Sequence, residues 1–402
     1  MPLPTDNYFS EYANLYDHIG MLQDHERMAA YHDAIKLNAA RHFKDKVVLD
    51  VGAGTGVLSI WAAKAGARKV YAVEGTAVAR HAEALVAAQG LSSVVTVLRG
   101  RMEELELPEK VDVLLSEWMG YFLLRESMVQ SVLFARDRWL KPSGVMYPSS
   151  ARLLISTMEE PGFAEARAAD VNEAMLQWDA LEHELSDRYD LTLAPLREAY
   201  RSETVDYFRH NAWQGHVPMG TTVGSPHVLL HVDMHNTTFD ELFGWRRVVE
   251  IGRAEEVHQL CGWFDVRFCA RTAADGTSSH DISMTSAVDE AVAAGDADDV
   301  DHAGCVELST APTTAPTHWA HTTLLLDPPL AAGSLLNVRL EQSKASHHDL
   351  NLTLGYRAGG DNARQVEASY AITAEFRTQE RTDYDPDAIA EENDDELDDG
   401  MN

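Results

Sequence analysis

Apolar strands alternate with amphipathic helices in the first third of the chain. Residues 5–45 carry a helical, amphipathic pattern, and from residue 46 to 148 short apolar runs alternate with helical segments. The runs are 47–51, 70–73, 94–98 and 111–115, and the helical segments are 54–65 and 76–89. Continuous apolar strands between helices are typical of a parallel sheet covered on both faces. The pattern predicts a doubly wound α/β domain over 46–148.

After Pro148 the apolar runs follow one another without regular helices between them. We expect strands at 151–156, 228–232, 248–251, 262–269, 322–326, 334–340 and 350–356. Strands that succeed one another in this way favour antiparallel pairing. The sequence thus predicts a second, antiparallel β domain over residues 149–382.

Two insertions and a tail accompany this β domain. Residues 163–215 have a helical pattern with many aromatic side chains, namely Trp178, Tyr189, Tyr200, Tyr207, Phe208 and Trp213. Residues 272–316 are rich in Ala, Thr, Ser, Gly and Asp and contain no Lys or Arg, which indicates a long mobile loop. Residues 383–402 hold ten carboxylates and no basic side chain, so we expect a disordered acidic tail.

The composition argues against membrane and secreted proteins. No apolar run reaches the ~18 residues of a transmembrane helix, and the start of the chain lacks the basic and apolar regions of a secretory signal. Cys261, Cys269 and Cys305 form no CxxC pair. They predict reduced thiols in a cytoplasmic or nuclear protein.

Negative charge is concentrated in the second half of the chain. Of 33 basic and 64 acidic residues, only 16 and 18 lie within residues 1–150, so nearly all of the net charge of −31 lies beyond them. Such a surface repels nucleic acid and acidic membranes and attracts basic partners. Taken by itself, this acidity is more often a means of solubility.

A glycine-rich turn, DVGAGTG, follows the first strand and begins at Asp50. Gly52 and Gly54 let the backbone approach a ligand closely, and free N–H groups at a helix start favour negative charge. The GxGxG spacing differs from the GxGxxG of dinucleotide sites. Glu74 ends the second strand, where it can accept hydrogen bonds from both hydroxyls of a ribose. Together these features predict a nucleoside-bearing cofactor, with NAD as the runner-up.

Two further features favour S-adenosylmethionine. Met102 and Glu103 follow the third strand, at the edge of the sheet where ligands bind, and Glu103 can meet an adenine amino group. Arg27, in the N-terminal helical segment, can neutralise the methionine carboxylate. A solvated turn and a surface arginine are the alternatives for these residues taken alone.

Two glutamates lie in the stretch SEWMGYFLLRESM, which begins at Ser116. Glu117 directly follows an apolar strand, and Glu126 begins the next helical segment. The apolar loop between them is expected to double back and bring both carboxylates into one dry pocket, where unpartnered carboxylates are costly. A guanidinium satisfies both, because its five N–H donors match carboxylates in a planar fork. The alternative is that Glu126 is a helix-start carboxylate paired with Arg125 or another neighbour.

These motifs resemble the protein arginine methyltransferases. The hairpin is similar to that family's double-glutamate loop, in the form found in plant-type members. Other similar stretches are Tyr8-Phe9-x-x-Tyr12, Met21-Leu22-x-Asp24-x-x-Arg27, LDVGAGTG, AKAGARKVYAVE and Thr317-His318-Trp319. The similarity is close over residues 8–158 and patchy to about residue 376.

The resemblance implies a Rossmann-like domain that binds S-adenosylmethionine, a β-barrel-like domain, and an arm at 163–215 that mediates homodimers. It implies that residues 1–45 close over the cofactor. Together with the analysis above, it assigns the cofactor to His18, Arg27, Gly52, Gly54, Glu74, Met102 and Glu103. It implies catalytic roles for Glu117, Glu126, His318 and Asp24. It places Tyr12, Met21, Met128 and Trp319 around the substrate arginine.

The implied reaction is in-line displacement of the sulfonium methyl by a guanidino nitrogen, helped by positioning and electrostatics. The expected substrates are Arg-rich proteins such as histone tails or Arg-Gly-rich proteins. In the resembling family, members that make the symmetric product carry Phe at the position of Met21, and members that stop at monomethylarginine usually lack Thr-His-Trp. Met21 and Met128 are slim enough to leave room for a second methyl group, which favours asymmetric dimethylarginine.

Several alternatives remain open from sequence. The product can instead be symmetric or only monomethylated, and Ala320-His321 stands where the family frequently has Lys-Gln, which bears on substrate preference. A methyltransferase for small molecules does not need the double-glutamate hairpin. A non-catalytic scaffold for Arg-rich proteins does not need an intact glycine turn and both glutamates. An oxidoreductase is the most distant alternative.

Overall fold

The computed structural model describes residues 12–159, 162–209, 212–253, 255–269, 304–344, 346–359, 364–373 and 378–383. The chain divides into two compact units. The first unit comprises Met1–Leu154, Leu230–Leu242 and Phe264–Ala320, and the second comprises Ile155–Leu229, Phe243–Trp263 and His321–Asn402. Every residue predicted for the methyl-transfer site belongs to the first unit.

The first unit begins, within the described residues, with consecutive helices. They are α2 (Leu15–Gln23), α3 (His25–Leu37) and the π-helix η1 (Ala39–Phe43). Asp24 is the N-cap of α3, and its side chain accepts the Arg27 backbone N–H at 3.0 Å. This bond satisfies one of the donors that a helix start leaves free. The inner face of α3, with Tyr31 and Ile35, is buried.

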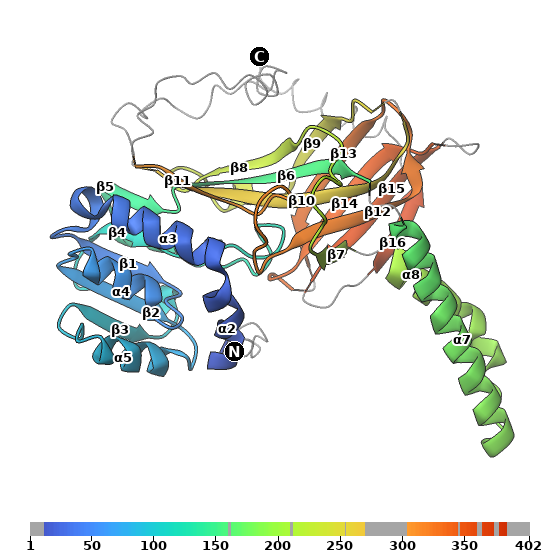
Figure 1. Cartoon of the computed structure of the whole chain (residues 1–402), viewed down its shortest axis with the longest axis horizontal. Helices are drawn as coiled ribbons and strands as arrows, with labels where there is room; N and C mark the ends of the chain where they lie inside the picture. Colours follow the sequence, from blue (N-terminus) through green and yellow to red (C-terminus); the bar gives the residue numbers. More distant parts are fainter. Residues whose placement is uncertain are drawn as a thin grey trace, which may run out of the picture. The chain divides into compact units, whose positions relative to one another are not determined.

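A five-stranded parallel sheet forms the centre of the first unit, in the order β3-β2-β1-β4-β5. The strands are β1 (Val47–Val51), β2 (Lys69–Glu74), β3 (Val95–Arg99), β4 (Val111–Leu115) and β5 (Leu140–Tyr147). The helices between them are α4 (Val57–Lys64), α5 (Ala79–Ala88) and α6 (Val129–Trp139), and Figure 1 shows α4 and α5 against the strands. The predicted doubly wound α/β fold is confirmed. Strand β5 escaped the sequence analysis because its first half is polar and partly exposed.

The order of the strands decides where a ligand binds. The chain moves from β1 outward to β3 and then returns to β4 on the other side of β1. Ligands of open α/β sheets bind at such a reversal, beyond the carboxyl ends of the strands. The glycine turn follows β1 and the double-glutamate hairpin follows β4, so both leave the sheet at this reversal.

The remaining strands form two antiparallel sheets, which confirms the predicted antiparallel fold class. The order in one is β7-β12-β10-β6-β8, with β11 paired to β10, and in the other β16-β15-β14-β13-β9. The first contains β6 (Ser150–Met158), β7 (Ala212–Gly215), β8 (His227–Asp233), β10 (Val257–Phe268), β11 (Val306–Ser309) and β12 (His321–Leu330). The second contains β9 (Trp245–Glu250), β13 (Leu335–Gln342), β14 (Leu350–Arg357), β15 (Gln365–Ile372) and β16 (Thr378–Asp383). The Tyr370 hydroxyl donates to the Leu325 carbonyl at 3.0 Å, which links β15 to β12 within the second unit.

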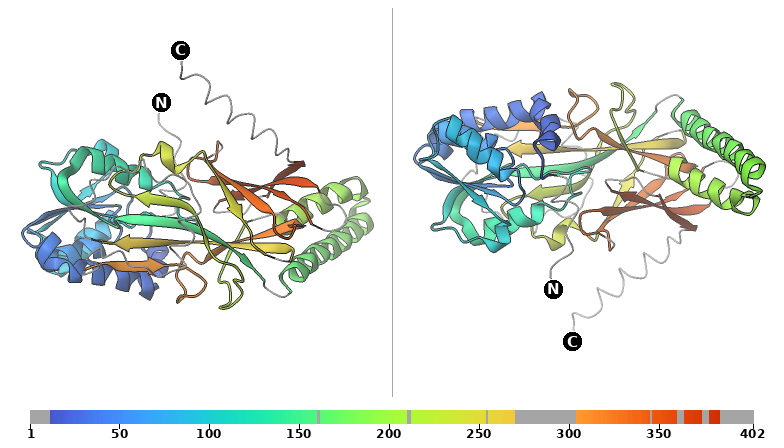
Figure 2. Two further views of the ribbon diagram at one scale, coloured as in Figure 1. Left: turned by 90° about the horizontal axis from the view of Figure 1, so that it is seen from above. Right: turned by 90° about the horizontal axis from the view of Figure 1, so that it is seen from below.

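Two helices of the second unit form the segment predicted as an arm. Helices α7 (Phe163–Tyr189) and α8 (Arg197–Arg209) lie side by side and extend away from the strands of their unit (Figures 1 and 2), joined through the 3-10 helix η3 (Ala194–Leu196). Several of the aromatic side chains pack within this segment. The rings of Trp178 and Tyr200 stack with centroids 4.4 Å apart. Tyr189 and Tyr207 remain exposed.

Two sequence predictions about the region after β10 are wrong. Cys269 and Cys305 form a disulfide, whereas reduced thiols were expected; Cys261 is free and buried. The antiparallel pairing of β10 with β11 explains this, because it sets Phe268 opposite Val306 and so brings the two cysteines together. A mobile loop was predicted over 272–316, but the last part of this range contains strand β11 and is not a loop throughout. The rest of that segment and the acidic tail beyond Asp383 lie outside the described residues.

None of the described helices is long and apolar enough to cross a membrane.

Candidate active site

The hairpin after β4, residues 116–128, has a strained backbone. Four of its non-glycine residues have positive φ, namely Phe122 (51°), Leu123 (65°), Glu126 (84°) and Ser127 (56°). Each costs on the order of 1–3 kcal/mol and persists only when surrounding contacts hold it. Gly120 closes the hairpin, because its N–H donates to the Leu123 carbonyl at 3.0 Å. A Cβ on Gly120 would lie 1.8 Å from the carbonyl oxygen of Arg125, so only glycine fits there.

Glu117 has one engaged and one unengaged oxygen. Its Oε2 accepts a hydrogen bond from Arg27 Nε at 3.1 Å, in an ion pair whose side chains are 12% and 10% exposed for Arg27 and Glu117. Its Oε1 is buried without a hydrogen-bond partner in the described part of the chain. Arg27 also donates from Nη1 to the Met21 carbonyl at 2.6 Å. A buried carboxylate oxygen without a donor is costly, so Glu117 is prepared for a further N–H donor.

Glu126 is held from both sides. Its Oε1 accepts from Arg125 Nη1 at 3.1 Å, and its Oε2 accepts from the Tyr12 hydroxyl at 3.0 Å. The alternative pairing of Glu126 with Arg125 is therefore present. The prediction that Glu126 lies at the start of a helix is wrong, because its backbone is in the left-handed region and α6 begins only at Val129.

His318 and Asp24 form the second part of the predicted catalytic set. The backbone N–H and ring Nδ1 of His318 lie 2.8 and 2.7 Å from Oδ2 of Asp24. Burial raises the pKa of Asp24, but the hydrogen bonds from His318 and from the Arg27 backbone outweigh it and hold this pKa below its ordinary value. Asp24 is therefore an ionised acceptor that orients the His318 ring.

Trp319 and Tyr31 fix the hairpin to the rest of the first unit. The Trp319 indole N–H donates to the Met119 carbonyl at 2.8 Å, and Trp319 is buried. The Tyr31 hydroxyl donates to the Ser116 carbonyl at 2.9 Å. No motif in the sequence marks Tyr31 as part of the site. It lies seven residues, about two helical turns, after the N-cap Asp24, and that spacing places it on a nearby face of α3.

The glycine turn is tied to Glu74 by backbone hydrogen bonds. The Gly54 N–H donates to Glu74 Oε2 at 2.8 Å, and the Thr76 N–H donates to Oε1 at 2.7 Å. A carboxylate oxygen can accept two hydrogen bonds, and each oxygen of Glu74 accepts one from these backbone N–H groups. Glu74 therefore has acceptor capacity left for ribose hydroxyls. Gly52 and Gly54 have φ of 71° and 55°, which glycine adopts without strain.

Met128 and His18 lie against the glycine turn. A Cβ on Gly52 would be 2.0 Å from Met128 Cε, and a Cβ on Gly54 would be 3.2 Å from His18 Cε1. His18 Nε2 also lies 3.1 Å from the Tyr12 carbonyl oxygen. Met128, predicted for the substrate pocket, thus connects the glutamate hairpin to the predicted cofactor turn.

The predicted adenine contacts lie in the 3-10 helix η2 (Met102–Glu104) after β3. Met102 is buried, and Glu103 Oε1 accepts a hydrogen bond from the Ser131 hydroxyl at 2.6 Å. Because Ser131 belongs to α6, this bond fixes η2 beside that helix. The other carboxylate oxygen of Glu103, Oε2, lies 3.9 Å from Arg101 Nε.

Asp50, at the base of the glycine turn, is a charged residue that the sequence analysis gave no role. It is fully buried and accepts from the Ser59 hydroxyl at 2.6 Å, while its Oδ1 has no partner in the described residues. Burial raises the pKa of Asp50 to about 7, a rise that the Ser59 hydrogen bond opposes and the Glu74 charge reinforces. Asp50 therefore titrates near neutral pH.

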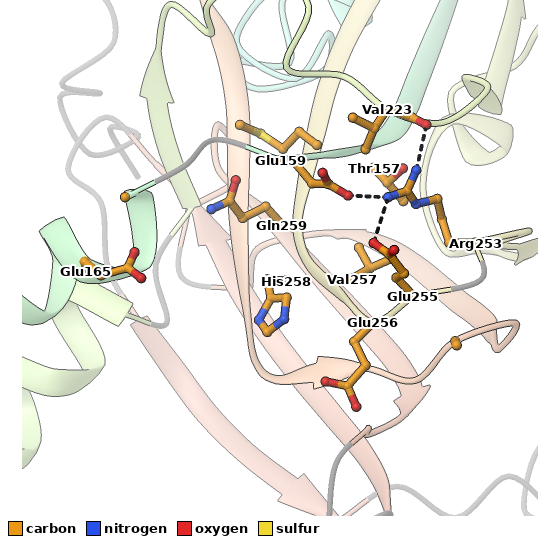
Figure 3. A pocket seen from close by; sticks show the side chains of 13 residues that line it. Thr157, Glu159, Glu165, Val223, Arg253, Glu255, Glu256, Val257, His258 and Gln259 are labelled. Atoms are coloured by element: carbon orange, nitrogen blue, oxygen red, sulfur yellow. Dashed lines mark hydrogen bonds and ion pairs between the residues drawn. The ribbon is translucent and has the colours of Figure 1, made fainter.

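A separate cavity of about 700 Å³ lies in the second unit. Figure 3 shows the side chains that line it, among which Arg253 lies beside Glu159 and Glu255. Arg253 pairs with Glu159, lies 3.9 Å from Glu255, and donates to a backbone carbonyl. None of the predicted site residues lines this cavity, so it is distinct from the predicted methyl-transfer site. No group of described His, Cys, Asp and Glu residues can hold a metal ion.

Comparison with known proteins agrees with this geometry. Residues 48–144 match the family model of a methyltransferase domain. The chain is 39% identical over 370 residues to protein arginine N-methyltransferase PRMT10 of Oryza sativa subsp. japonica, covering 90% of each protein. It is 36% identical over 375 residues to PRMT10 of Arabidopsis thaliana, covering 91% of each.

Solved structures agree as well. The crystal structure of Arabidopsis thaliana protein arginine methyltransferase 10 matches with a TM-score of 0.76 at 35% identity, over 91% of this chain and all (100%) of that one. The Trypanosoma brucei PRMT1 enzyme-prozyme complex with AdoHcy matches with a TM-score of 0.68 at 29% identity, over 90% of this chain and 100% of that chain.

Together with the matched methyltransferase domain and the relatives, the parallel sheet, its glycine turn and its acidic strand end identify a methyltransferase that uses S-adenosylmethionine. The chain belongs to the protein arginine N-methyltransferase family. The predicted family, fold class, enzymatic nature and cofactor are thereby confirmed.

Proposed function

We propose that this enzyme methylates one terminal nitrogen of a protein arginine twice, giving monomethylarginine and then asymmetric dimethylarginine. Glu117 and Glu126 are the catalytic carboxylates. The observation that carries this proposal is the buried Glu117 Oε1, which has no donor in the described residues although its partner oxygen is fixed by Arg27. A substrate guanidinium supplies the missing N–H and is the cation that matches a carboxylate pair.

The residues around the glycine turn fit S-adenosylmethionine. Positive φ at Gly52 and Gly54 opens the turn, and a side chain on Gly52 would collide with Met128. We assign the ribose hydroxyls to Glu74 and the adenine amino group to Glu103. When bound, S-adenosylmethionine supplies an electrophilic methyl group on a sulfonium sulfur. Arg27 is the cation available for its carboxylate, while Arg27 Nε remains on Glu117.

The chain's own residues divide the remaining work. The two glutamates hold the positive charge of the guanidinium away from the attacking nitrogen, so that electron density stays on that nitrogen. His318, oriented by the ionised Asp24, accepts the proton that the nitrogen loses after methyl transfer. No covalent enzyme intermediate is needed, because positioning and electrostatics suffice.

The asymmetric product is supported by the two methionines. Met128 lies between the hairpin and the glycine turn, and the Met21 carbonyl accepts a hydrogen bond from Arg27. Met128 is the last residue of the hairpin that carries both glutamates, and Met21 lies in α2, three residues before Asp24. A methionine side chain is slim and flexible, so it leaves room for one methyl beside the attacking nitrogen.

The partners we propose are a second copy of the chain and Arg-rich proteins such as histone tails or Arg-Gly-rich proteins. Apolar side chains are exposed on α7, on α8 and between them, namely Leu176, Leu181, Tyr189, Leu191, Leu196 and Tyr207. We assign these exposed side chains of the arm to the surface that a second copy covers. The net charge of −31 favours basic substrates.

The product identifies the activity. The enzyme is incubated with labelled S-adenosylmethionine and an Arg-Gly-rich peptide, and the hydrolysed peptide is separated by chromatography. We expect monomethylarginine early and asymmetric dimethylarginine at long times. Symmetric dimethylarginine, or monomethylarginine alone at long times, would contradict the proposed product.

A further inference from the structure

Arg125 and Glu126 are consecutive residues whose side chains meet inside the hairpin. The pair is buried, with side chains 7% and 12% exposed. Glu126 has a left-handed backbone, with φ of 84°, and its carboxylate meets the guanidinium of Arg125 at 3.1 Å. The hairpin thus combines a strained backbone with an ion pair between adjacent residues.

The rest of the hairpin fixes Arg125 itself. Its backbone N–H donates to the Tyr121 carbonyl at 3.1 Å, and its guanidinium carbon lies 5.8 Å from the centroid of the Tyr121 ring. Gly120 packs against its carbonyl oxygen. Burial raises the pKa of Tyr121, and the charge of Glu126 adds to this rise while that of Arg125 opposes it. Arg125 is therefore a rigid cation placed beside Glu126.

This arrangement sets the direction of the Glu126 carboxylate. Arg125 takes one acceptor position on Oε1 and the Tyr12 hydroxyl takes one on Oε2, so rotation of the carboxylate breaks one bond or the other. Glu117 is fixed in the same way by Arg27. Each glutamate of the hairpin therefore has its own protein guanidinium.

We propose that Arg125 is a positioning residue for Glu126. It holds the carboxylate plane in the direction that a substrate guanidinium requires and balances the negative charge of Glu126 before substrate enters. This inference rests on the catalytic role proposed for Glu126. Arg125 acts through Glu126 and does not itself touch the reacting atoms.

The test compares Arg125→Met, which keeps length and removes the charge, with Arg125→Lys, which keeps the charge and removes the fork. We expect Arg125→Met to lower kcat by ~10- to 100-fold, the scale of a misplaced catalytic group, with KM for the peptide changed less. Arg125→Lys is expected to recover part of the loss. The melting temperature and the cofactor Kd are expected to stay near those of the wild type in Arg125→Lys. A loss of kcat in that variant therefore cannot come from a folding defect, even if Arg125→Met is poorly folded.

A double-mutant cycle separates positioning from an independent role. Because Arg125 acts through Glu126, Arg125→Met is expected to change the activity of Glu126→Gln by less than ~2-fold. The proposal is overturned if the losses of activity in Arg125→Met and Glu126→Gln multiply in the double variant. It is also overturned if Arg125→Met alone keeps the kcat of the wild type. If Glu126→Gln itself keeps wild-type activity, the catalytic role of Glu126 fails and this inference falls with it. A wild-type enzyme inactive on the peptide would instead identify failure of the proposed function.

Discussion

His318 directs both its backbone N–H and its ring Nδ1 toward the same carboxylate oxygen of Asp24, at 2.8 and 2.7 Å. The other oxygen of Asp24 accepts the backbone N–H of Arg27 and caps α3. One carboxylate thus joins the loop that carries Thr317-His318-Trp319 to the helix that carries Arg27. This makes the orientation of the His318 ring sensitive to the start of α3.

We predict that His318→Ala lowers kcat by ~100-fold, the lower end of what a general base contributes, while the cofactor Kd changes little. Asp24→Asn is expected to lower kcat less, because it loosens the ring without removing it. His32→Ala is the matched control, since His32 is a partly exposed histidine of α3 that pairs with its neighbour Asp33 and packs its ring against Trp61. Steady-state methylation of the peptide measures all three. Equal kcat in His318→Ala and His32→Ala would exclude His318 as the base.

The buried Asp50 predicts a pH-dependent stability. Its folded pKa of about 7 lies above the ordinary value of 3.8, so the folded state binds the proton more tightly and loses stability as pH rises from about 4 to about 7. Asn keeps the shape and carries no charge. We therefore expect Asp50→Asn to be more stable than the wild type at pH 8 by on the order of a few kcal/mol, since one pKa unit is worth about 1.4 kcal/mol.

Denaturant unfolding at pH 4 and pH 8 measures this difference, which is expected to shrink toward zero at pH 4. Asp112→Asn is the control of opposite sign. Burial raises the pKa of Asp112, but the hydrogen bonds from Lys141 and from the Val47 N–H outweigh this effect and hold the pKa below its usual value. Its stabilisation is present at neutral pH and lost on acidification, so Asp112→Asn is expected to destabilise at pH 8. A constant difference between Asp50→Asn and the wild type across this range would refute the assignment.

The size of the side chain at position 21 is expected to decide the product. Met21→Phe adds bulk at the position that the family resemblance places beside the substrate guanidinium, so the second methyl transfer is expected to be crowded. We expect the ratio of dimethyl- to monomethylarginine to fall, or the symmetric isomer to form. Met21→Leu has a similar volume and is expected to retain the wild-type product. Chromatography of hydrolysed peptide gives both ratios, and an unchanged ratio in Met21→Phe would remove Met21 from the pocket.

The exposed face of α7 predicts the oligomeric state. Leu176 is 70% exposed on this helix, and a charge there is expected to weaken a dimer that buries it. Light scattering of the wild type is expected to give twice the mass of one chain. Leu176→Asp is expected to shift the measured mass toward that of a single chain. Leu335→Asp is the control, because Leu335 is 53% exposed on β13 of the same unit. A monomeric wild type would contradict the dimer.

Local patterns in the sequence predicted much of the first unit. The apolar runs gave four of the five parallel strands, and the GxGxG turn and the two glutamates marked the ends of β1 and β4. The partners of these residues could not be predicted. Arg27 reaches Glu117 across 90 residues, and Glu126 adopts a left-handed backbone that its own residue type does not predict. The Cys269–Cys305 disulfide likewise depends on the pairing of β10 with β11 across residues of low complexity.

The turnover of Glu117→Gln with an arginine peptide tests the central claim most directly. Gln keeps the shape of Glu117 and removes the charge that Oε1 presents to a guanidinium. We predict a loss of at least ~100-fold in kcat, the scale of removing one electrostatic catalytic group. Calorimetric titration is expected to show that S-adenosylmethionine still binds, and Glu106→Gln, at a glutamate whose side chain is 71% exposed in the same unit, is expected to match the wild type. Turnover of Glu117→Gln within a few-fold of the wild type would show that this carboxylate does not polarise the substrate and would contradict the account.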